Sequence, residues 1–285
     1  MAAGHAAGSQ TRPLVLRYAG MNAAASPLPT APPFPETADI ETSSDDYARR
    51  FSGATGAWML SVQERIALDF LADLPSGAAI LDVGGGHGQL APALCRAGFR
   101  VTVLGSAEDC RRRIAPLLNA DRCRFVVGNA IALPFSDRAF EAAVCFRLLT
   151  HCRAWPALVR ELCRVARRAV VADYPTRQSL NAIAPALFGA KKRLEGNTRP
   201  WTLFRHAEIR EAFAAHGFRT ARQAGQFFFP MVLHRALRCR PLSAGLERAA
   251  RAAGLTRRWG SPVIVKMVRA ASGAAAPNGR DEQAD

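Results

Sequence analysis

Five short runs of β-forming residues alternate with segments of helical pattern, and this alternation constrains the fold more than any other feature of the chain. The runs are AILDV (79–83), RVTVL (100–104), RFVVG (124–128), EAAVCF (141–146) and AVVADY (169–174). Parallel strands need a crossover, usually a helix, to bring the chain back before the next strand can pair. The alternation therefore predicts an α/β fold in which helices cover both faces of a parallel sheet.

Two later runs have the same character, TARQAGQFFF (220–229) and SPVIVKMV (261–268). We expect them to complete a seven-stranded sheet, mostly parallel, as an antiparallel pair at one edge. Apolar residues at helical spacing between residues 44 and 74 predict one or two helices before the sheet.

The two ends of the chain lack such patterns. Residues 1–42 are rich in alanine and proline and show no sustained period, and residues 271–285 resemble them in composition. Such segments bury too little apolar surface to offset the entropy of ordering. We expect two disordered ends around one domain at 43–270, with an insertion at about 174–205 whose scattered apolar residues suit a lid over an apolar pocket.

Charge and cysteine content narrow the class of protein. Thirty-eight basic residues against 23 acidic ones give a net charge of +15, but nearly all the basic residues are arginines spread along the chain, which favours a compositional bias over a nucleic-acid surface. The seven cysteines form no C-x-x-C pair, so we expect reduced cysteines in the core and no metal site. With no apolar run long enough to span a membrane and no secretory signal, a cytoplasmic protein is expected.

A glycine-rich loop follows the first strand, in the sequence LDVGGGHGQLAPAL (81–94). In such sheets the first turn from strand to helix approaches a ligand closely, and the helix N-terminus favours an anionic group. GHGQLA satisfies the loose dinucleotide pattern, with Gly86, Gly88 and Ala91. Asp82, however, would repel a pyrophosphate and would suit a ligand with a cationic group at that end.

This loop resembles the first motif of the class I S-adenosylmethionine-dependent methyltransferases. FVVGNAIALPFSDRAFEAAVCFRLLTHC (125–152) is similar to that family's stretch around the third and fourth strands. WPALVRELCRVARRAVVADYP (155–175) and LFRHAEIREAFAAHGF (203–218) are similar to the elements that follow. The resemblance spans roughly residues 45–270 and implies a Rossmann-like fold, with S-adenosylmethionine as cofactor.

Residue by residue, the resemblance implies a cofactor site. Asp82 would organise the methionyl end, and Gly84, Gly86 and Gly88 would let the backbone approach it. Asn129 and Ala130 match the positions that read the adenine. Gly105 stands where the family usually carries the acid that binds the ribose hydroxyls, so Ser106 or Glu108 would have to reach instead. Arg147, after the fourth strand, would contact the cofactor or the acceptor, and Tyr47 and Phe51 resemble aromatic residues of a helix that folds over the cofactor.

His151 is the predicted catalytic base, because it follows the fourth strand and histidine titrates near neutral pH. The turn there, FRLLTHC, lacks the Asn/Asp-Pro-Pro-aromatic pattern of enzymes that methylate nucleobases. We therefore expect methyl transfer to oxygen or carbon of a small, largely apolar acceptor. A non-catalytic binding module and an RNA methyltransferase are the alternatives, and a nicotinamide-dependent oxidoreductase ranks below them.

Seven arginines and one acid, Glu247, lie between Arg235 and Arg258, next to an apolar run. A basic amphipathic surface of this kind is typical of peripheral contact with anionic lipid, although a solvated helix face has the same pattern. Lipid contact would favour a lipid-soluble acceptor such as a quinone precursor.

Overall fold

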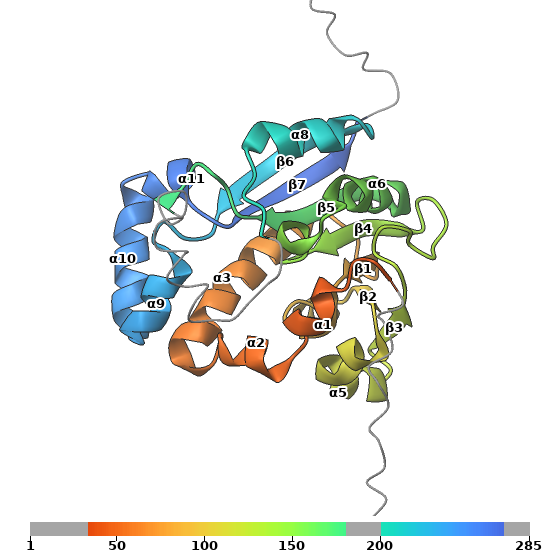
Figure 1. The fold of residues 1–285 in the computed structure, drawn as a ribbon, viewed down its shortest axis with the longest axis horizontal. Helices are drawn as coiled ribbons and strands as arrows, with labels where there is room; N and C mark the ends of the chain where they lie inside the picture. Colours follow the sequence, from red (N-terminus) through yellow and green to blue (C-terminus); the bar gives the residue numbers. More distant parts are fainter. Residues whose placement is uncertain (1–33, 181–200, 271–285) are drawn as a thin grey trace, which may run out of the picture. The chain divides into compact units, whose positions relative to one another are not determined.

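The computed structural model describes residues 34–180 and 201–270 of the chain. These residues form a seven-stranded sheet in the order β3-β2-β1-β4-β5-β7-β6 (Figure 1). Its strands are β1 Ala79–Val83, β2 Arg100–Gly105, β3 Cys123–Val127, β4 Phe140–Cys145, β5 Ala166–Tyr174, β6 Phe218–Gly225 and β7 Val263–Arg269. Strands β1 to β5 pair in parallel, and β7 runs antiparallel between β5 and β6. The predicted fold class is confirmed.

Helices and short 3₁₀ turns join these strands. The α-helices are α1 Ala38–Thr42, α2 Asp45–Arg49, α3 Gly53–Leu71, α4 Ala91–Arg96, α5 Ala115–Asn119, α6 Trp155–Val165, α8 His206–Ala214, α9 Met231–Leu237, α10 Arg240–Ala252 and α11 Leu255–Trp259. The 3₁₀ turns are η1 Gly85–His87, η2 Glu108–Ile114 and η3 Leu149–His151. Each of η1, η2 and η3 begins just beyond the carboxyl end of β1, β2 or β4.

The core consists of two apolar layers, one on each face of the sheet. Residues of α6 and α8 pack on one face with alternate residues of the strands, for example Leu158 and Phe213 with Leu81. Residues of α3 and α4 pack on the other, for example Phe70 and Leu94. The central strands β1 and β4 are nearly continuous apolar runs because both of their faces are covered, whereas the edge strand β6 is largely polar and exposed.

Helix α4 has the predicted local signals. Pro92 lies in its first turn, where the missing N–H costs nothing. Gly98, just beyond its end, has φ +85°, a left-handed conformation that a side chain would strain. Leu90 and Leu94 share the buried face.

The N-terminal boundary differs from the prediction. We expected an extension over residues 1–42, but α1 begins at Ala38 and belongs to the folded part. The Glu36 carboxylate accepts the main-chain N–H of Ala154, and the Asp39 carboxylate accepts that of Ser106. Composition did not predict this, because the segment is anchored by a few polar contacts distant in sequence rather than by an apolar period. Residues 1–33 and the C-terminal residues 271–285 lie outside the described residues.

The two ends of the predicted insertion lie side by side. Thr176 and Phe204 form a β-bridge, and the N–H of Arg177 donates to the Phe204 carbonyl at 2.9 Å. Residues 181–200, which hold most of the predicted lid, lie outside the described residues. The lid therefore stays a prediction.

The arginine-rich stretch folds as α9, α10 and α11. Glu247 faces inward: it is 3% exposed and accepts the N–H groups of Phe228 and Phe229 at 2.9 Å and pairs with the buried His234 at 3.0 Å. Within the described ranges, no helix is both long and apolar enough to cross a bilayer. Six of the seven cysteines are buried, as expected for core residues, and Cys239 is exposed.

Candidate functional site

Every site residue predicted from the sequence lies at one edge of the sheet, where the parallel strands have their carboxyl ends. Asp82 is the fourth residue of β1, and the glycine loop follows it. Ser106 follows β2, Asn129 and Ala130 follow β3, and Arg147 and His151 follow β4. Ligands bind along this edge in open α/β sheets.

The glycine loop takes a conformation that needs glycine at both ends. Gly84 and Gly88 flank η1 with φ +75° and +69°, in the left-handed region. Gly86 is enclosed by protein, since a Cβ there would lie 2.6 Å from Ser43 Oγ and would overlap the carbonyl of Cys110. The close approach of Gly84, Gly86 and Gly88 to a cofactor stays a prediction.

Asp82 is fully buried, and neither of its carboxylate oxygens has a hydrogen-bond partner among the described residues. A Cβ on Gly85 would overlap this carboxylate, so the loop passes directly against it. Burial raises the pKa of Asp82 from 3.8 to about 7. An unpartnered buried carboxylate is costly, and a cationic ligand group would relieve that cost.

His87 lies within the loop and is neutral, because burial and the charge of Arg147 lower its pKa to about 3. Its Nδ1 accepts the N–H of Gln89 at 3.2 Å, so the ring proton is on Nε2. Nε2 is buried and has no partner in the described part of the chain. The ring therefore offers a hydrogen-bond donor in this region.

Arg147 occupies the turn after β4 with φ +60°, which is uncommon for a residue with a side chain. Its N–H donates to Asp173 at 2.6 Å, and its guanidinium donates twice to Gln63 Oε1, at 2.8 and 3.2 Å. The guanidinium carbon lies 4.1 Å from the centre of the Phe51 ring, in a cation–π contact. Nη1 is buried and unpartnered among the described residues.

The predicted aromatic residues therefore contact Arg147. Tyr47 and Phe51 are both mostly buried and pack in a small cluster with α3, including Met59. Whether they also cover a cofactor is untested. Asp173 accepts the main-chain N–H of the same Arg147. Burial raises the pKa of Asp173 to about 6, because it outweighs the lowering effect of the Arg147 N–H and of the Arg147 charge.

At the end of β2, Ser106 binds another part of the protein. Its N–H and its hydroxyl donate to Asp39 of α1, at 2.6 and 2.5 Å. Glu108, the other predicted substitute for the missing acid, is exposed in η2 and pairs with Arg111 at 3.1 Å.

Asn129 forms a local turn, in which its Oδ1 accepts the N–H of Ile131 at 3.1 Å. The side-chain NH₂ group thus remains to donate to an acceptor, while the oxygen is already engaged. Ala130 is buried in the core.

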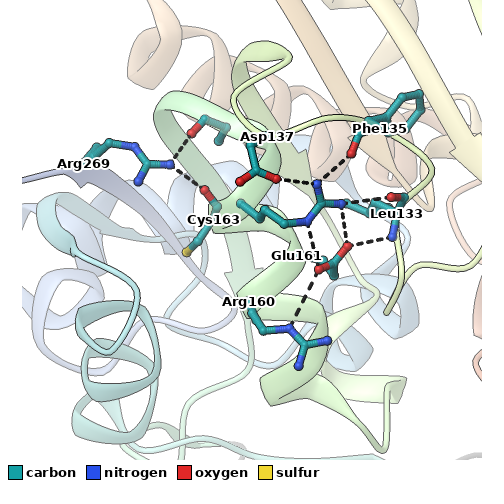
Figure 2. A network of polar contacts seen from close by, with 9 residues as sticks. Leu133, Phe135, Asp137, Arg160, Glu161, Cys163 and Arg269 are labelled. Atoms are coloured by element: carbon teal, nitrogen blue, oxygen red, sulfur yellow. Dashed lines mark hydrogen bonds and ion pairs between the residues drawn. The ribbon is translucent and has the colours of Figure 1, made fainter.

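The loop after β3 is fixed to α6 by a network of charged groups (Figure 2). Glu161 accepts the N–H of Leu133 at 2.8 Å, and Arg164 donates to the carbonyls of Leu133 and Phe135 at 2.9 and 2.7 Å. Burial alone would raise the pKa of Glu161, but its hydrogen bonds to Arg164 and Leu133 lower it. The network holds the main chain that follows Asn129 and Ala130.

His151 ends η3 and is half-buried. The neighbouring Thr150 exchanges two hydrogen bonds with the main chain of Thr202, at 2.9 and 3.0 Å. His151 thus lies at the predicted edge, beside the end of the insertion, and its role as a base is untested.

Four residues of this region were not predicted: Asp39, Gln63, Asp173 and Glu161. Asp173 could have been predicted as a functional residue, because it lies near the end of the apolar run AVVADY and buried strands rarely carry an acid. The other three carry no signal in their local sequence, since their contacts lie 28 to 84 positions away.

Comparison with known proteins is consistent with this geometry. Residues 80–169 match the family model of the methyltransferase domain. An uncharacterised methyltransferase of Mycobacterium avium is 30% identical over 119 residues, which are 41% of this chain and 47% of that protein. A demethylmenaquinone methyltransferase of Roseiflexus castenholzii is 30% identical over 141 residues, which are 48% of this chain and 59% of that one.

Among solved structures, the magnesium protoporphyrin IX methyltransferase of Synechocystis, crystallised with bound S-adenosylhomocysteine, has a TM-score of 0.54 at 18% identity. The alignment covers 79% of this chain and 94% of that one. The similarity supports the fold, whereas the chain spans only about half the length of the curated relatives that match first. The match of residues 80–169 to the methyltransferase-domain model, together with the fold, confirms the predicted resemblance to the class I S-adenosylmethionine-dependent methyltransferases.

Proposed function

We propose that this chain transfers the methyl group of S-adenosylmethionine to an oxygen or carbon atom of a small, largely apolar acceptor. The observation that carries the proposal is Asp82, a fully buried carboxylate with no partner among the described residues, lying against the glycine loop. A site with this carboxylate suits a ligand that brings its own positive charge.

The residues present fit the amino-acid end of S-adenosylmethionine. Asp82 would accept its ammonium group, and the loop backbone from Gly84 to Gly88 would lie beside it. Arg147 Nη1 and His87 Nε2 are donors without partners in the described part, so they would suit its carboxylate. An unpartnered acid and unpartnered donors at one sheet edge are the complement of a zwitterion.

When bound, S-adenosylmethionine supplies a methyl group on a sulfonium, which makes that methyl electrophilic already. The protein then has to hold the acceptor in line with it and keep water out. His151 would take the proton from a hydroxyl or carbon acid; it is half-buried and follows Thr150, whose hydroxyl donates to the carbonyl of Thr202. An acceptor that is ionised beforehand would need no base.

The apolar character of the acceptor rests on the insertion. Trp201 and Phe204 stand at its second end, and Phe204 packs against Trp155 and Tyr174. The substrates in the names of similar proteins, demethylmenaquinone and magnesium protoporphyrin IX, are consistent with a largely apolar small-molecule acceptor.

We also propose that α9, α10 and α11 contact an anionic lipid surface. Glu247 is turned inward, so it does not offset the exposed arginines of this stretch. Val232 on α9 and Leu242 on α10 are 53% and 48% exposed. Apolar side chains with arginines on one surface suit an interface that holds a lipid-soluble acceptor.

Isothermal titration calorimetry with S-adenosylhomocysteine tests the main proposal. We expect the wild type to bind in the micromolar range and Asp82→Ala to bind at least tenfold more weakly. Incubation with S-adenosylmethionine and a demethylated naphthoquinol should then release S-adenosylhomocysteine. Binding without release from any acceptor would favour the non-catalytic module, methyl transfer to RNA would favour the RNA enzyme, and no binding at all would overturn the proposal.

A further inference from the structure

We propose that Asp39 of α1 supplies the carboxylate that binds the ribose hydroxyls of the methyl donor, in place of an acid at the end of β2. The inference rests on the proposed function, because it concerns the cofactor named there. It assigns a binding residue to the N-terminal segment, which the sequence had suggested lies outside the domain.

The end of β2 cannot carry an acid of its own. In nucleotide-binding sheets of this type, an acid about twenty residues after the glycine loop binds the ribose, from the end of the second strand. Here that strand ends at Gly105, where a Cβ would lie 2.7 Å from the Cβ of Cys110 and 2.9 Å from the Phe125 ring. No side chain fits without displacing both neighbours, so the carboxylate has to come from another segment.

Asp39 brings a carboxylate to this position. It is 3% exposed, and its Oδ2 accepts the N–H of Ser106, the first residue after β2, at 2.6 Å. Its Oδ1 accepts the Ser106 hydroxyl at 2.5 Å, and the Cys110 thiol lies 3.5 Å from Oδ2. The main-chain bond fixes the carboxylate at the strand end, whereas the hydroxyl can rotate away and leave Oδ1 to a ligand hydroxyl.

No positively charged group is among the hydrogen-bond partners of Asp39 in the described part of the chain. Those partners are an amide, a hydroxyl and a thiol, all neutral. A buried carboxylate gains from every further donor, and a vicinal diol offers two. The ribose of an adenosine derivative is such a diol.

The segment that carries Asp39 lies along the carboxyl edge between the loops that follow β4 and β2. Glu36 binds the N–H of Ala154 beyond β4, Asp39 binds beyond β2, and Ser43 lies against Gly86 of the loop. Arg113 of η2 donates to the carbonyl of Ser43 at 2.9 Å. Figure 1 shows α1 beside the ends of β1 and β2. Asp39 and the glycine loop are thus neighbours, as the two ends of one ligand require.

The experiment uses the full chain and two probes, S-adenosylhomocysteine and its 2′-deoxy analogue, in calorimetric titrations. The wild type should bind the deoxy analogue at least tenfold more weakly. Asp39→Asn keeps one oxygen, which the Ser106 N–H occupies, and replaces the other by an NH₂ group that cannot accept a ribose hydroxyl. It should therefore bind S-adenosylhomocysteine at least tenfold more weakly and lose little more toward the deoxy analogue. Glu41→Gln, on the same helix, is the matched control and should behave as the wild type.

If Asp39 only anchors α1, Asp39→Asn will still discriminate between the two probes as the wild type does, and the proposal fails. It also fails if the wild type does not discriminate. Should Asp39→Asn not fold, Ser106→Ala decides: retained discrimination supports Asp39, and lost discrimination assigns the ribose to the serine hydroxyl instead. A wild type that binds neither probe would contradict the proposed function itself, which separates the two failures.

Discussion

The carboxylate of Asp173, near the end of β5, accepts the main-chain N–H of Arg147, two residues beyond β4, at 2.6 Å. Arg147 has a left-handed φ that a non-glycine residue rarely adopts without support. This bond therefore fixes the turn, and the turn directs the guanidinium to Gln63 and Phe51. One buried acid thus positions the cation at the centre of the proposed site.

Replacing Asp173 separates its role as an acceptor from its role as a charge. Asp173→Ala leaves the Arg147 N–H without a partner, so we expect a loss of about 1–3 kcal/mol of unfolding free energy. We also expect S-adenosylhomocysteine to bind at least tenfold more weakly. Asp173→Asn keeps an oxygen acceptor and should retain most of both properties. Equal losses in the two variants would show that charge, not the hydrogen bond, matters at this position.

Removing the charge of Asp82 should stabilise the folded protein and at the same time weaken cofactor binding. The pKa of Asp82 is 3.8 in the unfolded chain and about 7 in the folded one, so its contribution to stability is full below pH 4 and is lost as the pH rises through 7. Asp82→Asn carries no charge at any pH. At pH 8 it should be more stable than the wild type, by at most about 4 kcal/mol.

Urea unfolding at pH 4 and pH 8, with calorimetry alongside, checks this prediction. The difference in stability should appear at pH 8 and largely vanish at pH 4, while binding of S-adenosylhomocysteine is lost in the variant. A variant less stable than the wild type at pH 8 would mean that the carboxylate has a stabilising partner in the free protein.

Substitution of Gly85 by alanine should be as damaging as substitution of the neighbouring glycines of the loop. The φ of Gly85 is not left-handed, but a Cβ would overlap the Asp82 carboxylate. Gly85→Ala should therefore displace the loop and weaken S-adenosylhomocysteine binding at least tenfold. Gly245→Ala is the control, since nothing lies within 4 Å of its Cβ position in α10, and it should stabilise the protein by about 0.5–1 kcal/mol. Normal binding by Gly85→Ala would show that the loop has room.

Strands β1, β4 and β5 were predictable because each holds a short apolar run that is mostly buried, and the glycine loop was predictable because its residues are adjacent in sequence. Contacts between distant segments were not. In the sequence, Gly105 stands where an acid was expected. The structure shows why a side chain does not fit there: Cys110 and Phe125, which only the fold brings together, pack against this position. The acid at that strand end comes from Asp39, 67 positions before Ser106, in a segment whose composition predicted disorder.

Asn129 illustrates the same limit within a motif. Its position after β3 was predicted, but the bond from Ile131 to its oxygen, which decides what the side chain can still offer, depends on the turn geometry. The network that holds this turn, Glu161 with Arg164, comes from a helix about thirty residues later.

That network should matter for stability at low pH. Glu161→Gln weakens the bonds to Arg164 and Leu133, so we expect a loss of about 1–3 kcal/mol at pH 7. Because the folded pKa of Glu161 is lowered from 4.5, its contribution is present above that pH and is lost as the pH falls below it. The difference in unfolding free energy between Glu161→Gln and the wild type should therefore become smaller at low pH. Glu211→Gln, exposed on α8, should stay within about 0.5 kcal/mol of the wild type at both pH values.

The surface formed by α9, α10 and α11 gives the last prediction. Six of the seven arginines between Arg235 and Arg258 are exposed, and so are Val232 on α9 and Leu242 on α10. We expect the protein to sediment with phosphatidylglycerol vesicles and not with phosphatidylcholine vesicles, and to be released as salt screens the charges. Arg248→Ala combined with Leu242→Ser should reduce the bound fraction severalfold, whereas Arg210→Ala on α8 should not. Binding to neither vesicle type would make these helices an ordinary solvated face and remove the argument for an acceptor taken from the bilayer. Equal binding to both types would overturn the role of the arginines, because the contact would then not depend on anionic lipid.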